Sequence, residues 1–183
     1  DEARAGFDAG IRYGTHLFNA MPSLAHREPG LAGALLTDSR PCAGFIPDGI
    51  HTHPAMIGLA WKLLGRARFS LVTDCMAALG MEPGRHLLGE YECIVDRDSA
   101  RLPDGTLAGS ILSLDQGIRN LIAQTHCSLE DALATVTTTP ARLLGLSRER
   151  GRIEPGYVAD MVLLSRELEV RMTLAKGEIV YTA

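Results

Sequence analysis

The sequence has little of several features that would assign it to a particular class of protein. Its four cysteines (Cys42, Cys75, Cys93 and Cys127) lie far apart without a C-x-x-C pair, so neither a zinc knuckle nor a redox motif is indicated. No apolar stretch approaches the ~18 residues that cross a bilayer. No basic run is present and the net charge is −4, which argues against nucleic acid. With no secretory signal visible, we expect a cytoplasmic protein with neither membrane nor nucleic-acid partners.

The residues that are present predict one globular domain with a substantial core, because 46% of the 183 residues are apolar. Short apolar strands are expected at residues 13–18, 42–46 and 69–74. After the first strand comes a helix that Pro29 opens, and after the second a clearer helix that begins at Pro54. This alternation predicts a parallel sheet with helical crossovers, either open or closed into a barrel.

Polar side chains gather at the exits of these three strands. They are His16, Asn19, His51 and Asp74. In a parallel sheet the carboxyl ends of the strands share one edge, so these groups are expected to face a common mouth. Each has a simpler interpretation: Asp74 could cap the next turn, His16 could be a core histidine and His51 a solvent-exposed loop residue. The combination at matching strand ends favours a functional site.

The second half of the sequence predicts other elements. Residues 85–110 read as a β-hairpin insertion, with a turn at Asp104–Gly105. Ser113 is expected to cap a helix in a capping box with Gln116, and Ser128 to cap another. A short helix is expected to start near Pro140. After Gly151, three short strand-like segments predict a small antiparallel unit that must pack on something else.

Several motifs together resemble the amidohydrolase superfamily, and within it the enzymes that deacetylate N-acetylglucosamine 6-phosphate. The motifs that carry this resemblance run in the family's order over almost the whole chain: T-H-L-F-N-A-M-P (15–22), R-E-P-G-L-A-G-A (27–34), D-G-I-H-T-H-P (48–54), L-V-T-D (71–74), D-G-T-L-A-G-S (104–110), T-T-P-A-R-L-L-G-L (138–146) and G-R-I-E-P-G-Y-V-A-D (151–160).

The resemblance implies an α/β fold that forms part of a (β/α)8 TIM-type barrel of a metal-dependent hydrolase, with a small C-terminal β-sandwich portion. Residues 1–147 would then be a partial barrel and residues 148–183 the sandwich portion. The implied reaction is hydrolysis of the N-acetyl group of N-acetylglucosamine 6-phosphate to glucosamine 6-phosphate and acetate. The implied partners are this amino-sugar phosphate and a second copy of the chain in a homodimer.

The resemblance also implies roles for individual residues. Asp74 matches the catalytic aspartate and His16 a metal-ligand histidine, and His51 matches a histidine that binds substrate near the scissile carbonyl. Asn19 and Ala20 match a substrate-binding loop. Arg27 matches a phosphate-binding arginine that, in related dimers, can serve the neighbouring subunit's site. The implied cofactor is a divalent metal, with zinc favoured over iron or another ion.

The resemblance covers only the later part of such a protein, because the family's metal-binding glutamate and first histidine precede the matching region. A zinc site normally takes about three protein ligands, so we expect an incomplete metal site on these residues. The alternatives are a piece of a longer deacetylase, another amidohydrolase such as a cyclic amidase, or a truncated non-catalytic chain that binds a sugar phosphate.

Overall fold

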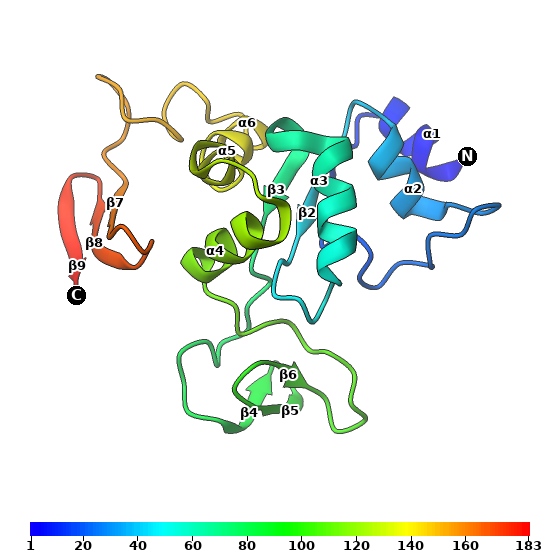
Figure 1. Ribbon diagram of the computed structural model, residues 1–183, viewed down its shortest axis with the longest axis horizontal. Coiled ribbons are helices and arrows are strands. Elements are labelled where there is room, and N and C mark those ends of the chain that lie inside the picture. Colours follow the sequence, from blue (N-terminus) through cyan, green and yellow to red (C-terminus); the bar gives the residue numbers. More distant parts are fainter.

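A computed structural model describes all 183 residues, and a three-stranded parallel sheet forms its centre (Figure 1). The strands are β1 (Tyr13–Gly14), β2 (Cys42–Phe45) and β3 (Phe69–Leu71), in the spatial order β1-β2-β3. The helices between them are α2 (Gly30–Thr37) and α3 (Pro54–Arg68), and α1 (Glu2–Asp8) precedes the first strand. The predicted alternation of strands and helices in a parallel sheet is therefore confirmed.

Two of the predicted strands end earlier than expected, and this changes where the predicted site residues His16 and Asp74 lie. β1 stops at Gly14, because the backbone turns into positive φ at His16 (30°) and Phe18 (78°) and cannot stay extended. His16 was expected on the strand but follows it. β3 stops at Leu71, so Asp74, with φ of 50°, lies three residues beyond the strand end rather than at it.

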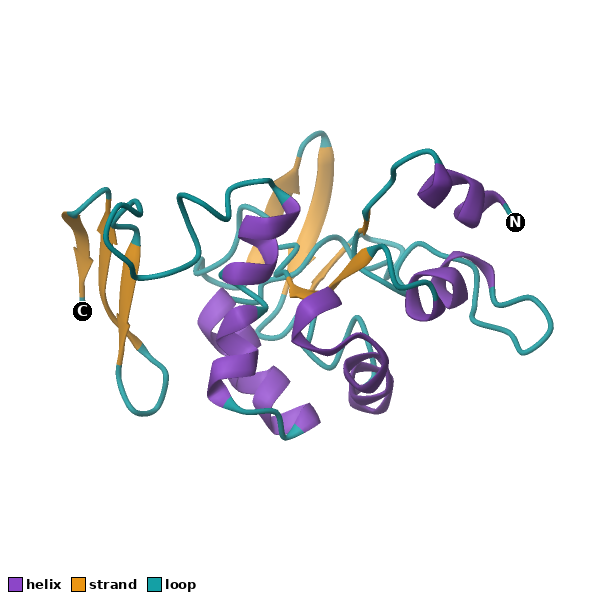
Figure 2. Ribbon diagram, turned by 90° about the horizontal axis from the view of Figure 1, so that it is seen from above, coloured by secondary structure: helices purple, strands orange, loops and turns teal.

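The main core lies between the sheet and the helices on one side of it (Figure 2). Phe45 and Phe69 are fully buried, and their rings stack at a centroid distance of 4.0 Å. The Trp61 indole of α3 meets Phe69 edge-on at 5.5 Å. Ile57 and Leu64 of α3 are also buried, as their helical spacing predicts.

Arg68, at the end of α3, ties three separate backbone segments together. Its guanidinium donates to the carbonyls of Leu35, Leu36, Asp38, Pro41 and Leu63. These carbonyls include the free end of α2, where a helix leaves acceptors without partners. Burial lowers the pKa of Arg68, although an arginine this basic keeps its charge.

The segment expected as a hairpin insertion forms a three-stranded antiparallel sheet. Its strands are β4 (Gly84–Leu88), β5 (Tyr91–Val95) and β6 (Ala100–Arg101). It has its own small core, which includes Met76, Cys93 and Val95. Met76 is buried in this core, whereas Tyr91 is 67% exposed. In Figure 1 this sheet hangs below the parallel sheet, at the edge where β3 ends.

Three helices follow the insertion: α4 (Leu114–Thr125), α5 (Leu129–Ala134) and α6 (Thr138–Leu143). Ser128 caps α5 by accepting the amide of Asp131, as predicted. The capping box at α4 is wrong: the Ser113 side chain makes no cap bond, and Gln116 instead donates to Asn120. Leu114 and Leu129 are 45% and 46% exposed, since both are the first residues of their helices.

The chain ends in a separate antiparallel sheet of β7 (Met161–Leu164), β8 (Val170–Ala175) and β9 (Glu178–Thr182), in the order β7-β8-β9. Three strands were predicted here and three are present. The sheet lies to one side of the helices (Figures 1 and 2) and exposes several apolar side chains, including Leu163 and Ile179. None of the helices is both long and apolar enough to traverse a bilayer.

Candidate functional site at the carboxyl edge of the parallel sheet

The loops that leave β1, β2 and β3 share one edge of the sheet, because the three strands are parallel. The loop after β1 is fastened to β2, since the Leu17 amide donates to the Gly44 carbonyl at 2.8 Å. It also meets the loop after β2, where Asn19 Nδ2 donates to Thr52 Oγ1 at 3.4 Å. His16, Asn19 and His51 are thus brought to one edge, which Asp74 joins from β3.

His16 carries an unsatisfied polar atom. Its Nδ1 is buried and has no hydrogen-bond partner. Buried polar groups are nearly always hydrogen-bonded, so an unpaired buried imidazole nitrogen indicates a binding position for a ligand. A metal ion is a ligand of this kind, because histidine nitrogens are common metal ligands.

The loop after β2 builds a buried carboxylate–imidazole pair. Asp48 Oδ2 lies 2.6 Å from His51 Nδ1, and the two side chains are only 9% and 6% exposed. Asp48 Oδ1 also accepts the amides of Ile50 and His51. Burial alone would raise the pKa of Asp48, but the hydrogen bonds from His51 and the two amides outweigh burial and lower it. The Asp48 carboxylate therefore accepts a hydrogen bond from Nδ1–H and leaves Nε2 of His51 free for other contacts.

The sequence analysis did not single out Asp48, although the D-G-I-H motif is typical of an aspartate at the start of a turn. An aspartate in this position can accept hydrogen bonds from the backbone amides two and three residues further on. The histidine three positions on then falls within reach of the same carboxylate.

Replacing Asp48 with asparagine should lower the free energy of unfolding by about 1–3 kcal/mol at pH 7, because buried bonds to a carboxylate are lost. A depressed carboxyl pKa stabilises the fold above the ordinary value of 3.8 and loses that contribution as the pH falls through the folded-state pKa. The difference between wild type and Asp48→Asn should therefore shrink below about pH 4. Urea unfolding across this range measures it, with exposed Asp98→Asn as the control. Equal stability of Asp48→Asn and the control Asp98→Asn at pH 7 would contradict the prediction.

Asp74 is held in place by the segment that ends in L-A-G-S. The Ser110 amide donates to the Asp74 carbonyl at 2.8 Å, and Met76 donates to the Ser110 carbonyl at 2.9 Å. The Ser110 hydroxyl also bonds to the Thr73 carbonyl. Asp74 is an exposed residue, so its carboxylate is open to a ligand at the edge of the sheet. The insertion thus returns to brace the backbone around the candidate catalytic carboxylate.

Gly109 makes this contact possible. It has a φ of 66°, and a Cβ placed there would lie 2.9 Å from the Asp74 carbonyl oxygen. Gly109→Ala should cost about 1–2 kcal/mol of stability for the left-handed conformation and a further ~1–3 kcal/mol for the clash. Gly105→Ala is the matched control, because Gly105 also has positive φ but nothing lies within 4 Å of its Cβ position. If the two variants lost equal stability in urea unfolding, the close approach at Asp74 would carry no cost.

Tyr13 is a second residue that the sequence analysis did not single out. Its hydroxyl occupies the space beside Gly44, where a Cβ would lie 2.1 Å from the phenolic oxygen. Burial raises the pKa of Tyr13, and the nearby Cys42 and Asp74 raise it further. A hydrogen bond with Thr15 lowers the pKa but does not outweigh these effects. The phenol therefore stays protonated and reaches toward the same edge as Asp74. A tyrosine on a short strand gives no sequence signal of this placement.

Two of the predicted site residues do not join the others. Arg27 lies on the exposed loop between β1 and α2, which projects away from the sheet in Figures 1 and 2, and its side chain makes no ion pair or hydrogen bond. Ala20 is exposed and has a φ of 54°, so it offers backbone groups on an open turn. Neither Arg27 nor Ala20 is hydrogen-bonded to His51 or Asp74 in this structure.

The metal that the sequence resemblance implies is only partly matched by the residues present. His16, with its orphaned nitrogen, fits as one ligand. The 183 residues nevertheless contain no group of three or more histidine, cysteine, aspartate or glutamate side chains that could hold an ion. A catalytic zinc site takes about three protein ligands. This chain therefore supplies one candidate ligand and not a complete metal site.

A parallel sheet with helical crossovers and with histidine and aspartate side chains beyond its carboxyl edge is the arrangement found in barrel-type α/β enzymes. Residues 1–180 match the family model described as the amidohydrolase family. The chain belongs to this family.

Individual relatives and solved structures show which members of the family the chain is similar to. The chain is 40% identical to N-acetylglucosamine-6-phosphate deacetylase from Bos taurus over 98% of its own length and 45% of the relative's. It is similar to the crystal structure of the Thermotoga maritima deacetylase, with a TM-score of 0.94, 36% identity, and coverage of 100% of this chain and 50% of that chain. A Mycobacterium smegmatis deacetylase mutant in complex with N-acetyl-D-glucosamine-6-phosphate gives a TM-score of 0.92 and 40% identity, with coverage of 100% and 49%. The chain spans about half the length of the proteins it matches.

Proposed function

We propose that the protein takes part in hydrolysis of the N-acetyl group of N-acetylglucosamine 6-phosphate, giving glucosamine 6-phosphate and acetate. The observation that carries the proposal is the placement of His16, His51 and Asp74 at one sheet edge, in a chain about 40% identical over nearly its whole length to deacetylases of this specificity. An amide is a poor electrophile, so its hydrolysis needs groups that move protons and stabilise developing charge.

The proposed architecture follows from the same comparisons. The three parallel strands and their helices are part of a (β/α)8 barrel, within residues 1–147, and the sheet of β7–β9, within residues 148–183, is one portion of a β-sandwich. The exposed apolar side chains of β7 and β9 support this second assignment, because a sheet buries an apolar face against another layer.

In the proposed mechanism, Asp74 takes the proton of the attacking water and returns it to the leaving amine. His51 lies near the scissile carbonyl. Its Nδ1 is held by Asp48, so when His51 is protonated its Nε2–H can donate to the oxyanion while Asp48 balances the charge. Asn19 and the backbone at Ala20 position the sugar.

A divalent metal, with zinc favoured, would be held in part by His16 and by further ligands that these residues do not bring together. When bound, such an ion activates water and polarises a carbonyl. Arg27 stands on a projecting loop away from the edge, which suits a contact to the phosphate of a substrate bound by a partner in a homodimer. We place the enzyme in the cytoplasm, where its sugar phosphate would be found.

Acetate release from N-acetylglucosamine 6-phosphate, with metal content determined on the same sample, tests the proposal. In protein whose metal site is completed by the family's preceding ligands, the expected result is turnover of this substrate, much less turnover of N-acetylglucosamine without its phosphate, and no hydrolysis of a cyclic amide such as dihydroorotate. Hydrolysis of the cyclic amide alone would replace the proposal with a cyclic amidase. Binding of the sugar phosphate without acetate release or metal would identify a non-catalytic binding chain.

A further inference from the structure

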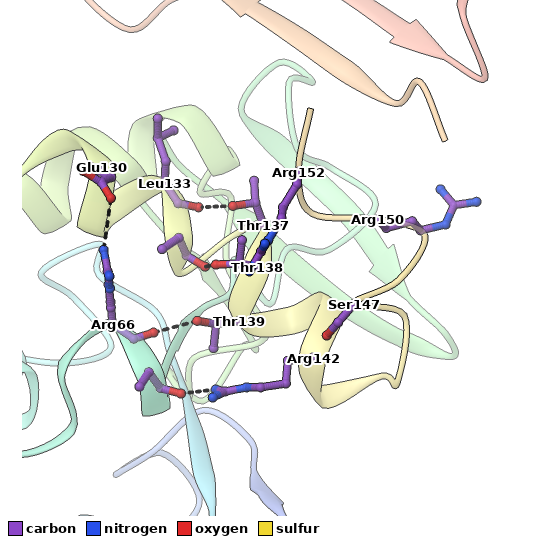
Figure 3. A pocket seen from close by; sticks show the side chains of 12 residues that line it. Arg66, Glu130, Leu133, Thr137, Thr138, Thr139, Arg142, Ser147, Arg150 and Arg152 are labelled. Carbon is purple, nitrogen blue, oxygen red and sulfur yellow. Dashed lines mark hydrogen bonds and ion pairs between the residues drawn. The ribbon is translucent and has the colours of Figure 1, made fainter. Parts of the chain in front are cut away.

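A hollow lies at the edge of the parallel sheet opposite to the candidate site. It has a volume of about 530 Å³ and is bounded by the end of α3, by α5 and α6, and by residues 147–152 (Figure 3). Arg66 and Ala67 line it and come shortly before β3, whereas Asp74 follows the other end of that strand. The hollow is therefore separate from the candidate site around His51 and Asp74. We call it the basic pocket.

The lining of the basic pocket is polar and positively charged. Only three of its twelve residues are hydrophobic. The lining includes four arginines and one glutamate, together with four hydroxyl side chains: Arg66, Arg142, Arg150 and Arg152 with Glu130, and Thr137, Thr138, Thr139 and Ser147. Guanidinium groups and hydroxyls together are the donors that bind phosphate.

Two of the arginines already have fixed partners. Arg142 donates to the Ala67 carbonyl, and Arg150 pairs with Asp160 and turns away from the hollow in Figure 3. The floor is also fixed, because Thr139 Oγ1 donates to the Arg66 carbonyl at 2.6 Å. A pocket whose walls are already bonded needs little reorganisation to accept a ligand.

The other two arginines make only exposed ion pairs, which a ligand can replace. Arg66 pairs with Glu130 at 3.2 Å and with Asp131 at 3.1 Å, and Arg152 pairs with Glu154 at 3.4 Å. Their side chains are 54% and 58% exposed, and such exposed pairs contribute little. In Figure 3 the Arg152 side chain runs toward Thr138, along the wall of the hollow. The Ser147 hydroxyl makes no hydrogen bond and adds a free donor.

We propose that the basic pocket binds the phosphate group of a small phosphorylated metabolite, with Arg66 and Arg152 as its charged contacts. The volume is within the range of sites for molecules of this size. A dianionic phosphate offers three oxygens, which suits two guanidinium groups and a hydroxyl better than a monocarboxylate does. The site is independent of the proposed deacetylase reaction.

The test measures binding by isothermal titration calorimetry of the purified protein, in an Arg27→Ala background that removes the phosphate contact proposed for the substrate site. The probes are inorganic phosphate and glucosamine 6-phosphate. The test variant is Arg66→Gln/Arg152→Gln. The control is Arg148→Gln, which removes one charge from an exposed neighbour that does not line the pocket.

The expected result is saturable phosphate binding that weakens at least about tenfold in the double variant, weakens with added salt, and is unchanged in the control. Tighter binding of the sugar phosphate than of inorganic phosphate would identify a metabolite as the source, and equal binding would identify free phosphate. Absence of binding, or equal binding in the double variant and the control, would overturn the proposal. Should the double variant fail to fold, Arg152→Gln alone, whose only partner is the exposed Glu154, gives the same comparison.

Discussion

Asp74→Asn should reduce acetate release from N-acetylglucosamine 6-phosphate by about 10²–10⁴-fold, the contribution expected of a general acid–base group. An asparagine keeps the size of the side chain but cannot take a proton from water. The exposed carboxylate follows β3 and its backbone is braced by Ser110, so the change should leave the loop in place. Steady-state kinetics would show the loss in kcat with KM little changed, because the role proposed for Asp74 is at the reacting atoms and not at the phosphate or the sugar ring.

The matched control for this experiment is Asp8→Asn. Asp8 belongs to α1, away from the carboxyl edge, and its ion pair with Arg40 is exposed, with the Asp8 side chain 70% accessible. This variant should retain the activity of the wild type. If Asp74→Asn retained it as well, then the general base would be another group, and His51 would be the first to examine.

Phe69→Ala should lower the free energy of unfolding by about 3–5 kcal/mol, the usual cost of removing a buried aromatic ring. Phe69 is fully buried, stacks on Phe45 at 4.0 Å and meets Trp61 edge-on. It therefore joins β2, β3 and α3 in one aromatic cluster, and the cavity would open at the centre of the core. Urea denaturation followed by circular dichroism would measure the loss.

Tyr91→Ala serves as the control for aromatic removal, because Tyr91 is 67% exposed on β5 and should cost no more than about 0.5 kcal/mol. Similar losses in the two variants would mean that the Phe69 site collapses fully around the smaller side chain. The aromatic cluster would then contribute less than its burial suggests.

The regular elements were predictable because their signals are local. Apolar runs and the prolines at 29 and 54 placed β2, β3, α2 and α3. The end of β1 was not predictable. The backbone has positive φ at His16 and Phe18, where the sequence has no glycine to signal it, and the loop is held there by its hydrogen bond to β2. At α4 the capping box failed because Gln116 has competing partners at Asn120 and Arg119 one turn along the helix.

The position of the candidate site was predictable, but the neighbouring residues that hold or surround it were not. Polar residues at parallel strand ends must share an edge, so His16, His51 and Asp74 could be grouped from the sequence. Asp48 and Tyr13 act through contacts that depend on the folded loops, which a linear pattern does not reveal. The roles that the family resemblance implies for His16, His51 and Asp74, and for Asn19, Ala20 and Arg27, stay predictions.

The arginine at the end of α3 has a consequence for local opening of the chain. Arg68 bonds to carbonyls of α2, of the α2–β2 loop and of its own helix, so none of these segments can separate without breaking bonds in the others. Segments joined in this way open as one cooperative unit. Native-state hydrogen exchange should therefore find the amides at the C-terminal turns of α2 and α3 exchanging with a common opening free energy, although more than twenty-five residues separate them.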